Sequence, residues 1–268
     1  MPPSPPLRVL CALSSGVDSS VSALLCLRPS PPLLRSLQSV AVRNGWGGKV
    51  GDEGTELKVG GIHMSSWEDH DNPNGGQYCE TSNQDYSRVQ SLSSHLSTIP
   101  TRPQISWNPT VVRLDGVREY WNHVFSPFVD TLNLNVSSSA SSIHTPNPDV
   151  SCNEFVKFRH LRSHAFDKLG YHVLVTGHYA SLGAGGAMSE ARDKRKDQTY
   201  FLCTTRAPDF RGVHFPLDSI TKGGTRMNHP PATIAESSPL PPPSCTLPIP
   251  HGSSTVRCIA RHFGLPTA

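Results

Sequence analysis

The sequence has 268 residues, and its 24 Lys and Arg against 21 Asp and Glu leave a formal net charge of +3. This length suits one large domain with a buried core, but hydrophobic residues (36%) and charged residues (17%) are scarce, and the 25 Pro and 21 Gly predict loop-rich or disordered insertions. No apolar run approaches the roughly 18 residues of a membrane-spanning helix, and the N-terminus lacks the apolar core of a secretory signal, so we expect a soluble protein without membrane contacts.

The first predicted unit is a strand, a polar loop and a helix. Residues 7–13 form a short apolar run that is typical of a buried strand. The run S-S-G-V-D-S-S follows at 14–20, and then Val21, Leu24 and Leu25 recur at helical spacing. A strand that leads through a Gly-containing loop into a helix is the first unit of an open α/β sheet.

The next part of the chain carries weaker patterns. Residues 29–58 are rich in Pro, Gly and Ser, and we interpret them as a loop or insertion. Val59–Met64 predicts a second strand and Asp85–Leu96 a helix, which polar residues and prolines between 91 and 109 should end. Thr110–Leu114 predicts a third strand.

Two helices are predicted in the middle of the chain. Residues 117–132 place apolar side chains on one helical stripe, and a Ser-rich linker follows at 137–142. The run T-P-N-P-D at 145–149 is incompatible with a helix. Residues 152–169 then form a strongly amphipathic pattern that should end at Gly170.

The remaining pattern completes the fold prediction. Val173–Val175 is the clearest buried strand, and T-G-H-Y follows it directly. After Phe215 the hydrophobic pattern weakens, and residues 230–250 are rich in Pro and Ser. Residues 256–263 predict a last short helix. Alternating strands and helices predict an α/β fold, a Rossmann-like open parallel sheet with helices on both faces.

The loop at 14–20 is the strongest local signal for a ligand. Such a loop at the carboxyl end of a first strand presents backbone N–H groups to a phosphate. Gly16 allows close approach of the backbone, and four serines add hydroxyl donors. The alternative is an ordinary helix N-terminus capped by serine.

A second constellation surrounds Cys152. Two prolines stiffen a loop that should deliver Asp149 and Cys152 to the start of a helix. A helix N-terminus would lower the pKa of the thiol and make it nucleophilic, and Asp149 could relay a proton or cap the helix. A buried structural cysteine beside an Asp cap is an equally good interpretation of these residues.

The other cysteines and histidines indicate no metal site. The seven cysteines are widely spaced and contain no C-x-x-C pair, which argues against a secreted disulfide framework and against structural zinc. His160 and His164 share a helix face but have no acidic metal motif around them, so we predict no bound metal there.

Two motifs resemble known enzyme families. The run S-S-G-V-D-S-S resembles the S-G-G-x-D-S/T-S signature of the PP-loop ATP pyrophosphatases, with Ser15 in place of a glycine; we expect the loop to tolerate this change. The run T-P-N-P-D-V-S-C-N-E-F-V-K-F at 145–158 resembles the tRNA-specific 2-thiouridylases, called mitochondrial tRNA-5-taurinomethyluridine 2-sulfurtransferases in eukaryotes. Further matching blocks occur in the family's order at 61–69, 119–125, 176–180, 196–202 and 256–266.

The resemblance implies roles for individual residues. Cys152 would be the catalytic nucleophile, assisted by Asp149. ATP would be bound by Ala12, Leu13, Ser14, Ser15, Gly16, Val17, Asp18 and Ser19, with Met64 and Gly177 at the adenosine. The target uridine would contact Asn147, Pro148 and Asp149, and the tRNA would contact Lys196, Asp197 and Gln198. Without the resemblance, an exposed charged turn is the preferred interpretation of the basic run at 192–196.

The implied reaction is 2-thiolation of tRNA. ATP, with Mg²⁺, adenylates the 2-oxygen of the wobble uridine, and a persulfide sulfur then displaces AMP. The partners would be tRNA and a persulfide donor protein, and we expect a monomer. In the family a second cysteine carries the persulfide, shortly after the Gly-Leu-Pro match; the sequence ends at Ala268, so we expect a truncated enzyme.

Three alternatives to the complete thiolation reaction are considered. The chain could perform only the adenylation half-reaction, it could be a non-catalytic ATP- or tRNA-binding remnant, or it could adenylate a small metabolite. The expected division is a nucleotide-binding catalytic domain at 1–222, a disordered Pro/Ser-rich insertion at 223–254, and the start of the segment leading to the second cysteine at 255–268. Resemblance to the eukaryotic members implies a mitochondrial location.

Overall fold

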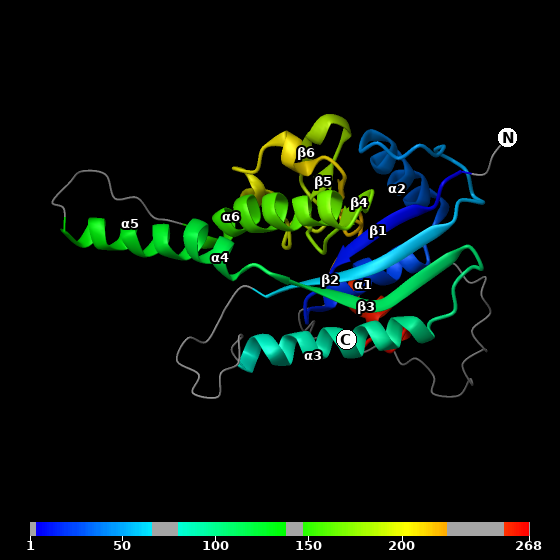
Figure 1. Cartoon of the computed structure of the whole chain (residues 1–268), viewed down its shortest axis with the longest axis horizontal. Coiled ribbons are helices and arrows are strands. Elements are labelled where there is room, and N and C mark those ends of the chain that lie inside the picture. Colours follow the sequence, from blue (N-terminus) through cyan, green and yellow to red (C-terminus); the bar gives the residue numbers. More distant parts are fainter. Residues whose placement is uncertain (1–3, 66–79, 138–146, 224–254, 268) are drawn as a thin grey trace.

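The computed structural model describes residues 4–65, 80–137, 147–223 and 255–267, and these form a parallel sheet between two layers of helices (Figure 1). The sheet has five strands in the order β3-β2-β1-β4-β7, and every neighbouring pair is parallel. Its strands are β1 (Leu7–Ala12), β2 (Leu57–Ser65), β3 (Ile105–Asp115), β4 (Val173–Val175) and β7 (Val213–His214). The predicted α/β class with an open parallel sheet is confirmed.

Strand β1 lies at the centre of the sheet and is buried on both faces. Its side chains alternate between two hydrophobic clusters: Leu7, Val9 and Cys11 belong to one, and Leu10 to the other. A strand covered by helices on both faces needs apolar residues at consecutive positions, which explains the apolar run Val9–Leu13 that follows the exposed Arg8.

The helices divide between the two clusters. The first cluster takes side chains from α1 (Val17–Leu27), α2 (Pro31–Arg43), α3 (Glu80–Thr98) and α7 (Val256–His262). The second is built on one long helix, which starts as α6 (Pro148–Ser151) and continues through the π-helical segments η2 (Cys152–Leu161) and η3 (His164–Lys168). Its centre is Phe158, whose ring lies 5.1 Å from that of Phe210 and 5.8 Å from that of Phe215, centroid to centroid.

Residues 29–58 are not a simple loop, because they contain helix α2. Ser30 caps this helix by accepting a hydrogen bond from the Leu33 N–H at 3.5 Å. The two prolines that follow occupy its first turn, where the backbone N–H groups have no partner within the helix and proline is tolerated. Leu37, Val40 and Ala41 of α2 are buried and pack in the first cluster.

The segment from 91 to 109 also differs from the prediction. Helix α3 continues to Thr98, and β3 begins at Ile105, earlier than expected. Pro109 therefore lies inside β3, where the register with β2 shifts between Val59 and Gly61. Proline is compatible with this place because β3 is an edge strand and the irregular pairing removes the need for its N–H.

The other expected helices are confirmed with shifted bounds. The helix predicted at 117–132 is formed by α4 (Val117–Tyr120), the π-helical η1 (Trp121–Phe125) and α5 (Ser126–Ser137), and it extends beyond the end of the sheet (Figure 1). Gly170 ends the long helix with a φ of +65°. Residues 138–142 of the predicted linker and the Pro/Ser-rich stretch at 224–254 lie outside the described residues.

Short elements complete the chain. Strands β5 (Ser181–Leu182) and β6 (Met188–Ser189) pair antiparallel, and three 3₁₀ turns are η4 (Ala184–Gly186), η5 (Thr199–Leu202) and η6 (Ala207–Phe210). Residues 255–267 return to the first cluster, where Ile259 and Leu265 are buried. Among the described helices, none combines the length and apolar character that a bilayer crossing requires.

Candidate functional site

The strand order places a ligand site at the carboxyl end of β1. The chain proceeds from β1 outward to β2 and β3, then crosses to β4 on the other side of β1, so the order reverses between β1 and β4. In open α/β sheets, ligands bind outside the carboxyl ends of the strands at this reversal. Here the loops that follow β1 and β4, residues 13–16 and 176–180, border the same position.

Gly177 shows how closely these two loops approach. A Cβ atom added to Gly177 would lie 2.8 Å from the Ser19 nitrogen and 2.9 Å from the Asp18 carbonyl carbon. Both atoms belong to the backbone of α1 and have little freedom to move. Glycine is therefore required where the β4 loop packs against the first turn of α1.

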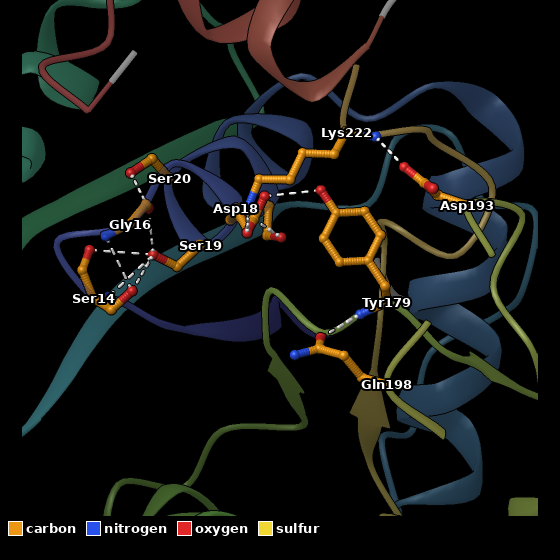
Figure 2. A network of polar contacts seen from close by, with 10 residues as sticks. Ser14, Gly16, Asp18, Ser19, Ser20, Tyr179, Asp193, Gln198 and Lys222 are labelled. Atoms are coloured by element: carbon orange, nitrogen blue, oxygen red, sulfur yellow. Dashed lines mark hydrogen bonds and ion pairs between the residues drawn. The ribbon is translucent and has the colours of Figure 1, made fainter. Parts of the chain in front are cut away.

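Serine side chains order the loop after β1. The Ser19 hydroxyl accepts a hydrogen bond from the Ser14 N–H at 3.1 Å and donates to the Gly16 carbonyl at 3.0 Å. The Ser20 hydroxyl donates to the same carbonyl, and the Gly16 N–H donates to the Ser14 hydroxyl (Figure 2). Ser15 has no positive φ, so it fits the loop without the backbone strain that a glycine would relieve.

The start of α1 is not the serine-capped N-terminus of the alternative interpretation. The capping position is Gly16, which has no side chain, and no side chain caps the helix there. Ser14 and Gly16 are exposed, and the buried residues Ser19 and Ser20 hold the loop from behind. Exposed backbone at the positive end of a helix dipole favours an anion.

Asp18 ties this loop to two distant parts of the chain. Its carboxylate accepts a hydrogen bond from the Tyr179 hydroxyl at 2.8 Å and pairs with the Lys222 ammonium at 2.6 Å (Figure 2). Burial and the bond to Asp18 raise the pKa of Tyr179, so its hydroxyl remains a hydrogen-bond donor. The sequence patterns assign no role to either Tyr179 or Lys222.

Gln198, one of the predicted tRNA-contact residues, pairs with the backbone of Tyr179. The Gln198 side-chain oxygen accepts from the Tyr179 N–H at 2.9 Å, and the Gln198 N–H donates to the Tyr179 carbonyl at 2.8 Å. Asp197 stabilises the local structure, because its carboxylate accepts hydrogen bonds from Thr199 and from the Ala191 N–H. Burial alone would raise the pKa of Asp197, but these hydrogen bonds lower it. Lys196 is exposed.

Cys152 does not lie at a helix start, contrary to the prediction. The helix begins at Pro148, so proline and Asp149 are part of its first turn, and Cys152 follows one turn later. Asn147, not Asp149, is the cap, because its side-chain oxygen accepts from the Asp149 N–H at 3.1 Å and the Val150 N–H at 3.4 Å. Thr145 and Pro146 of the same motif lie outside the described residues.

The thiol of Cys152 is held in its protonated form. Burial raises its pKa, and the carboxylate of the exposed Asp149 raises it further, while the Lys157 ammonium lowers it. The pKa is thus not lowered as predicted, because Cys152 lies beyond the first turn of the helix and its half-buried side chain is desolvated. Deprotonation then requires a base or a change of surroundings when substrate binds.

A short chain of contacts connects Cys152 with the loop after β1. Its neighbour Asn153 is buried, and its side-chain oxygen meets the His178 Nε2 at 3.2 Å and the Lys157 ammonium at 2.9 Å. His178 follows Gly177, which packs on α1. Burial keeps the pKa of His178 well below its usual range, so the ring is neutral. Its Nε2 is then the donor to the Asn153 side-chain oxygen. The β4 loop therefore contacts the start of α1 through Gly177 and the residue next to Cys152 through His178.

Two further positions fit this arrangement. Met64 is the second-last residue of β2, and a Cβ atom added to Gly116 would lie 2.9 Å from the Met64 Cγ, so the Met64 side chain is closely packed. Tyr120 on α4 belongs to the apolar stripe predicted from the sequence. Burial, with the nearby Cys152 and Asp149, raises the pKa of its phenol.

The protonation state of Cys152 predicts how fast it is alkylated. The rate of modification by iodoacetamide should increase with pH through a midpoint above about 8.5, the ordinary value for a thiol, because burial raises the pKa. Peptide mass spectrometry measures Cys152 separately from the exposed Cys203. Lys157→Met should move the midpoint further upward, and a midpoint below about 8 in the unmodified chain would contradict the assignment.

Comparisons with known proteins place the chain in a family. The family described as tRNA methyl transferase HUP domain matches residues 51–236. The tRNA-specific 2-thiouridylase MnmA of Mycoplasmopsis synoviae (strain 53) is 31% identical over 224 residues, which cover 81% of this chain and 48% of that protein. Two proteins of the same name are each 32% identical to this chain. The match to the protein of Ureaplasma parvum serovar 3 (strain ATCC 27815 / 27 / NCTC 11736) covers 80% of this chain and 46% of that protein. The match to the protein of Acholeplasma laidlawii (strain PG-8A) covers 82% of this chain and 48% of that protein.

The chain spans about half the length of these curated relatives. The matched region includes the β4 loop, the helix of Cys152 and the segment of Gln198. These matches and the parallel sheet of the HUP type identify the chain as a member of the tRNA-specific 2-thiouridylase family.

Proposed function

We propose that this chain carries the ATP-dependent catalytic site of a tRNA 2-thiouridylase. The observation that supports this most is the contact between the β4 loop and both halves of the site. Gly177 packs against the start of α1, and His178 reaches the neighbour of Cys152. A loop suited to phosphate and a cysteine-bearing helix that both contact the β4 loop suit a reaction in which an adenylated intermediate is attacked by sulfur.

ATP would be held by the loop after β1. Backbone N–H groups of residues 14–19 and the dipole of α1 would face its phosphates, and Met64 and Gly177 would border the adenosine. Across the described parts of the chain, no group of three or more His, Cys, Asp or Glu side chains is placed to hold a metal ion. We therefore expect Mg²⁺ to be coordinated mainly by phosphate oxygens and water, as is usual for this ion.

The first half-reaction forms a good leaving group on the uridine. The 2-oxygen of the wobble uridine attacks the α-phosphorus of ATP, the bond to the bridging oxygen breaks, and its electron pair leaves with pyrophosphate. Uridine would lie near Asn147, Pro148 and Asp149, and the tRNA near Lys196, Asp197 and Gln198. The exposed Asp149 carboxylate is suited to accept a proton at this stage.

The second half-reaction transfers sulfur. The terminal sulfur of a persulfide, carried by a donor protein or another cysteine, attacks C2, and AMP leaves with the electron pair of the C2–O bond. The Cys152 thiolate then attacks the inner sulfur of the persulfide. The S–S bond breaks, sulfur remains on the base as the thiocarbonyl, and a disulfide joins Cys152 to the carrier.

The proposal predicts two separately measurable products. The purified chain is incubated with ATP, Mg²⁺, a persulfide donor and unmodified tRNA, and pyrophosphate and 2-thiouridine are measured independently. Both products are expected. Pyrophosphate alone would restrict the function to adenylation, and neither product despite ATP binding would identify a binding protein and contradict the proposal.

A further inference from the structure

The ion pair between Lys222 and Asp18 places a positive charge at the loop after β1. The two charged groups are 2.6 Å apart, and their side chains are only 21% and 26% exposed. Because water screens partly buried charges less than exposed ones, the attraction to Asp18 holds the ammonium at this place. We infer that Lys222 binds the β- and γ-phosphates of ATP and stabilises pyrophosphate as it leaves; this inference rests on the proposed use of ATP.

The backbone of Lys222 is held in place on both sides. Its N–H donates to the Asp193 carboxylate at 2.9 Å, and its carbonyl accepts from the Arg257 N–H at 3.4 Å. The preceding carbonyl of Thr221 accepts from the Val256 N–H at 2.9 Å, at the start of α7. A side chain with a fixed base loses less conformational freedom when it binds a ligand, so these contacts preorganise Lys222 for phosphate binding.

The ammonium keeps donors for a ligand while it pairs with Asp18. A lysine ammonium has three N–H donors, and the bond to Asp18 uses one of them. Asp18 is in the first turn of α1, so the ammonium lies at the same helix end whose backbone would face the phosphates (Figure 2). Lys222 also neutralises the Asp18 carboxylate, which would otherwise repel a polyphosphate.

This position differs from that of the basic residues predicted to contact tRNA. Lys194, Arg195 and Lys196 are exposed, and Lys194 pairs with Glu190 on the surface. Lys222 instead faces the first turn of α1. When the bond between the α-phosphorus and the bridging oxygen breaks, negative charge accumulates on pyrophosphate, and a fixed cation there stabilises the transition state.

The inference is tested by the affinity of Lys222→Met for inorganic pyrophosphate, ATP and AMP. Affinity for pyrophosphate and ATP should fall roughly 10- to 100-fold, the usual effect of losing a charge-assisted contact. Affinity for AMP should stay within about twofold, since AMP lacks the β- and γ-phosphates. Lys222→Arg, which keeps the charge, should retain part of the affinity.

Lys58→Met is the matched control. Lys58 is half-exposed, pairs with Glu56, and lies near the start of β2, whereas Met64 lies near the end of that strand. This variant should leave all three affinities unchanged. Pyrophosphate binding by Lys222→Met at the wild-type affinity would overturn the inference alone. Failure of the wild-type chain to bind ATP and pyrophosphate would overturn the proposed use of ATP as well.

A second measurement needs no variant. Acetic anhydride modifies accessible lysines of the wild-type protein, and peptide mass spectrometry reports each site. Pyrophosphate should protect Lys222 from acetylation, AMP should not, and Lys58 should be modified equally in all samples. Equal modification of Lys222 with and without saturating pyrophosphate would contradict the inference, whatever the stability of the variants.

Discussion

Replacing Cys152 with serine is expected to abolish formation of 2-thiouridine and to leave the affinity for ATP within about twofold of wild type. Serine has nearly the shape of cysteine, so the packing of the half-buried side chain is preserved. Its hydroxyl, however, cannot form the disulfide through which sulfur is released to the base. The measurement is mass spectrometry of nucleosides from tRNA incubated with each variant, with ATP binding measured in parallel.

Cys258→Ser is the matched control for this variant. Cys258 is an exposed free cysteine on α7 and has no place in the proposed site. The Cys258→Ser variant should form 2-thiouridine at the wild-type rate. Continued thiolation by Cys152→Ser would exclude Cys152 as the nucleophile, and loss of ATP binding in that variant would instead assign the cysteine a structural role.

Replacing Gly177 with alanine is expected to damage the ATP site and the fold together. The new methyl group would lie 2.8 Å from the Ser19 nitrogen and 2.9 Å from the Asp18 carbonyl carbon, so the β4 loop and α1 must separate. Overpacking of this kind usually lowers the free energy of unfolding by about 1–3 kcal/mol. The displaced loop should also bind ATP at least roughly tenfold more weakly, which calorimetry measures.

Gly47→Ala provides the comparison, because a Cβ atom added to Gly47 meets no atom within 4 Å and its φ is not positive. Its unfolding free energy and ATP affinity should match those of the wild type. If Gly177→Ala binds ATP normally at wild-type stability, the two loops are not packed as described, and the proposed link between thiol and phosphate loop loses its basis.

The sequence was informative wherever local pattern and tertiary structure agree. The first strand, the loop of Ser14 and Gly16, and the strand at 173–175 are predicted correctly, because both strands are buried on two faces and so contain consecutive apolar residues. Their order along the chain was enough to predict an open α/β sheet. Adding the resemblance of two motifs placed the proposed site at these loops.

Features that depend on proline position were missed. The two prolines after Ser30 contribute to the interpretation of residues 29–58 as a loop, although the first turn of α2 accepts them. Pro148 was excluded from a helix for the same reason, and it begins one. A proline alone does not show whether it stands before, at or inside the start of a helix, so single-residue patterns fail there.

Contacts between distant segments could not be predicted either. Lys222 lies 204 positions from Asp18, and no motif marks it. The pKa of Cys152 depends on burial and on the charges of Lys157 and Asp149, and burial in particular is set by the tertiary fold. His178 and Tyr179 lie within the matching T-G-H-Y block, but only the fold shows that one reaches Asn153 and the other Asp18.

The central claim is that the loop after β1 activates a tRNA uridine with ATP beside Cys152. Pyrophosphate release from ATP, measured without a sulfur donor, tests it most directly. Release should depend on unmodified tRNA with uridine at the wobble position, and should be absent with the same tRNA carrying cytidine there. Release that is equal with both tRNAs, or that needs no tRNA, would contradict the account.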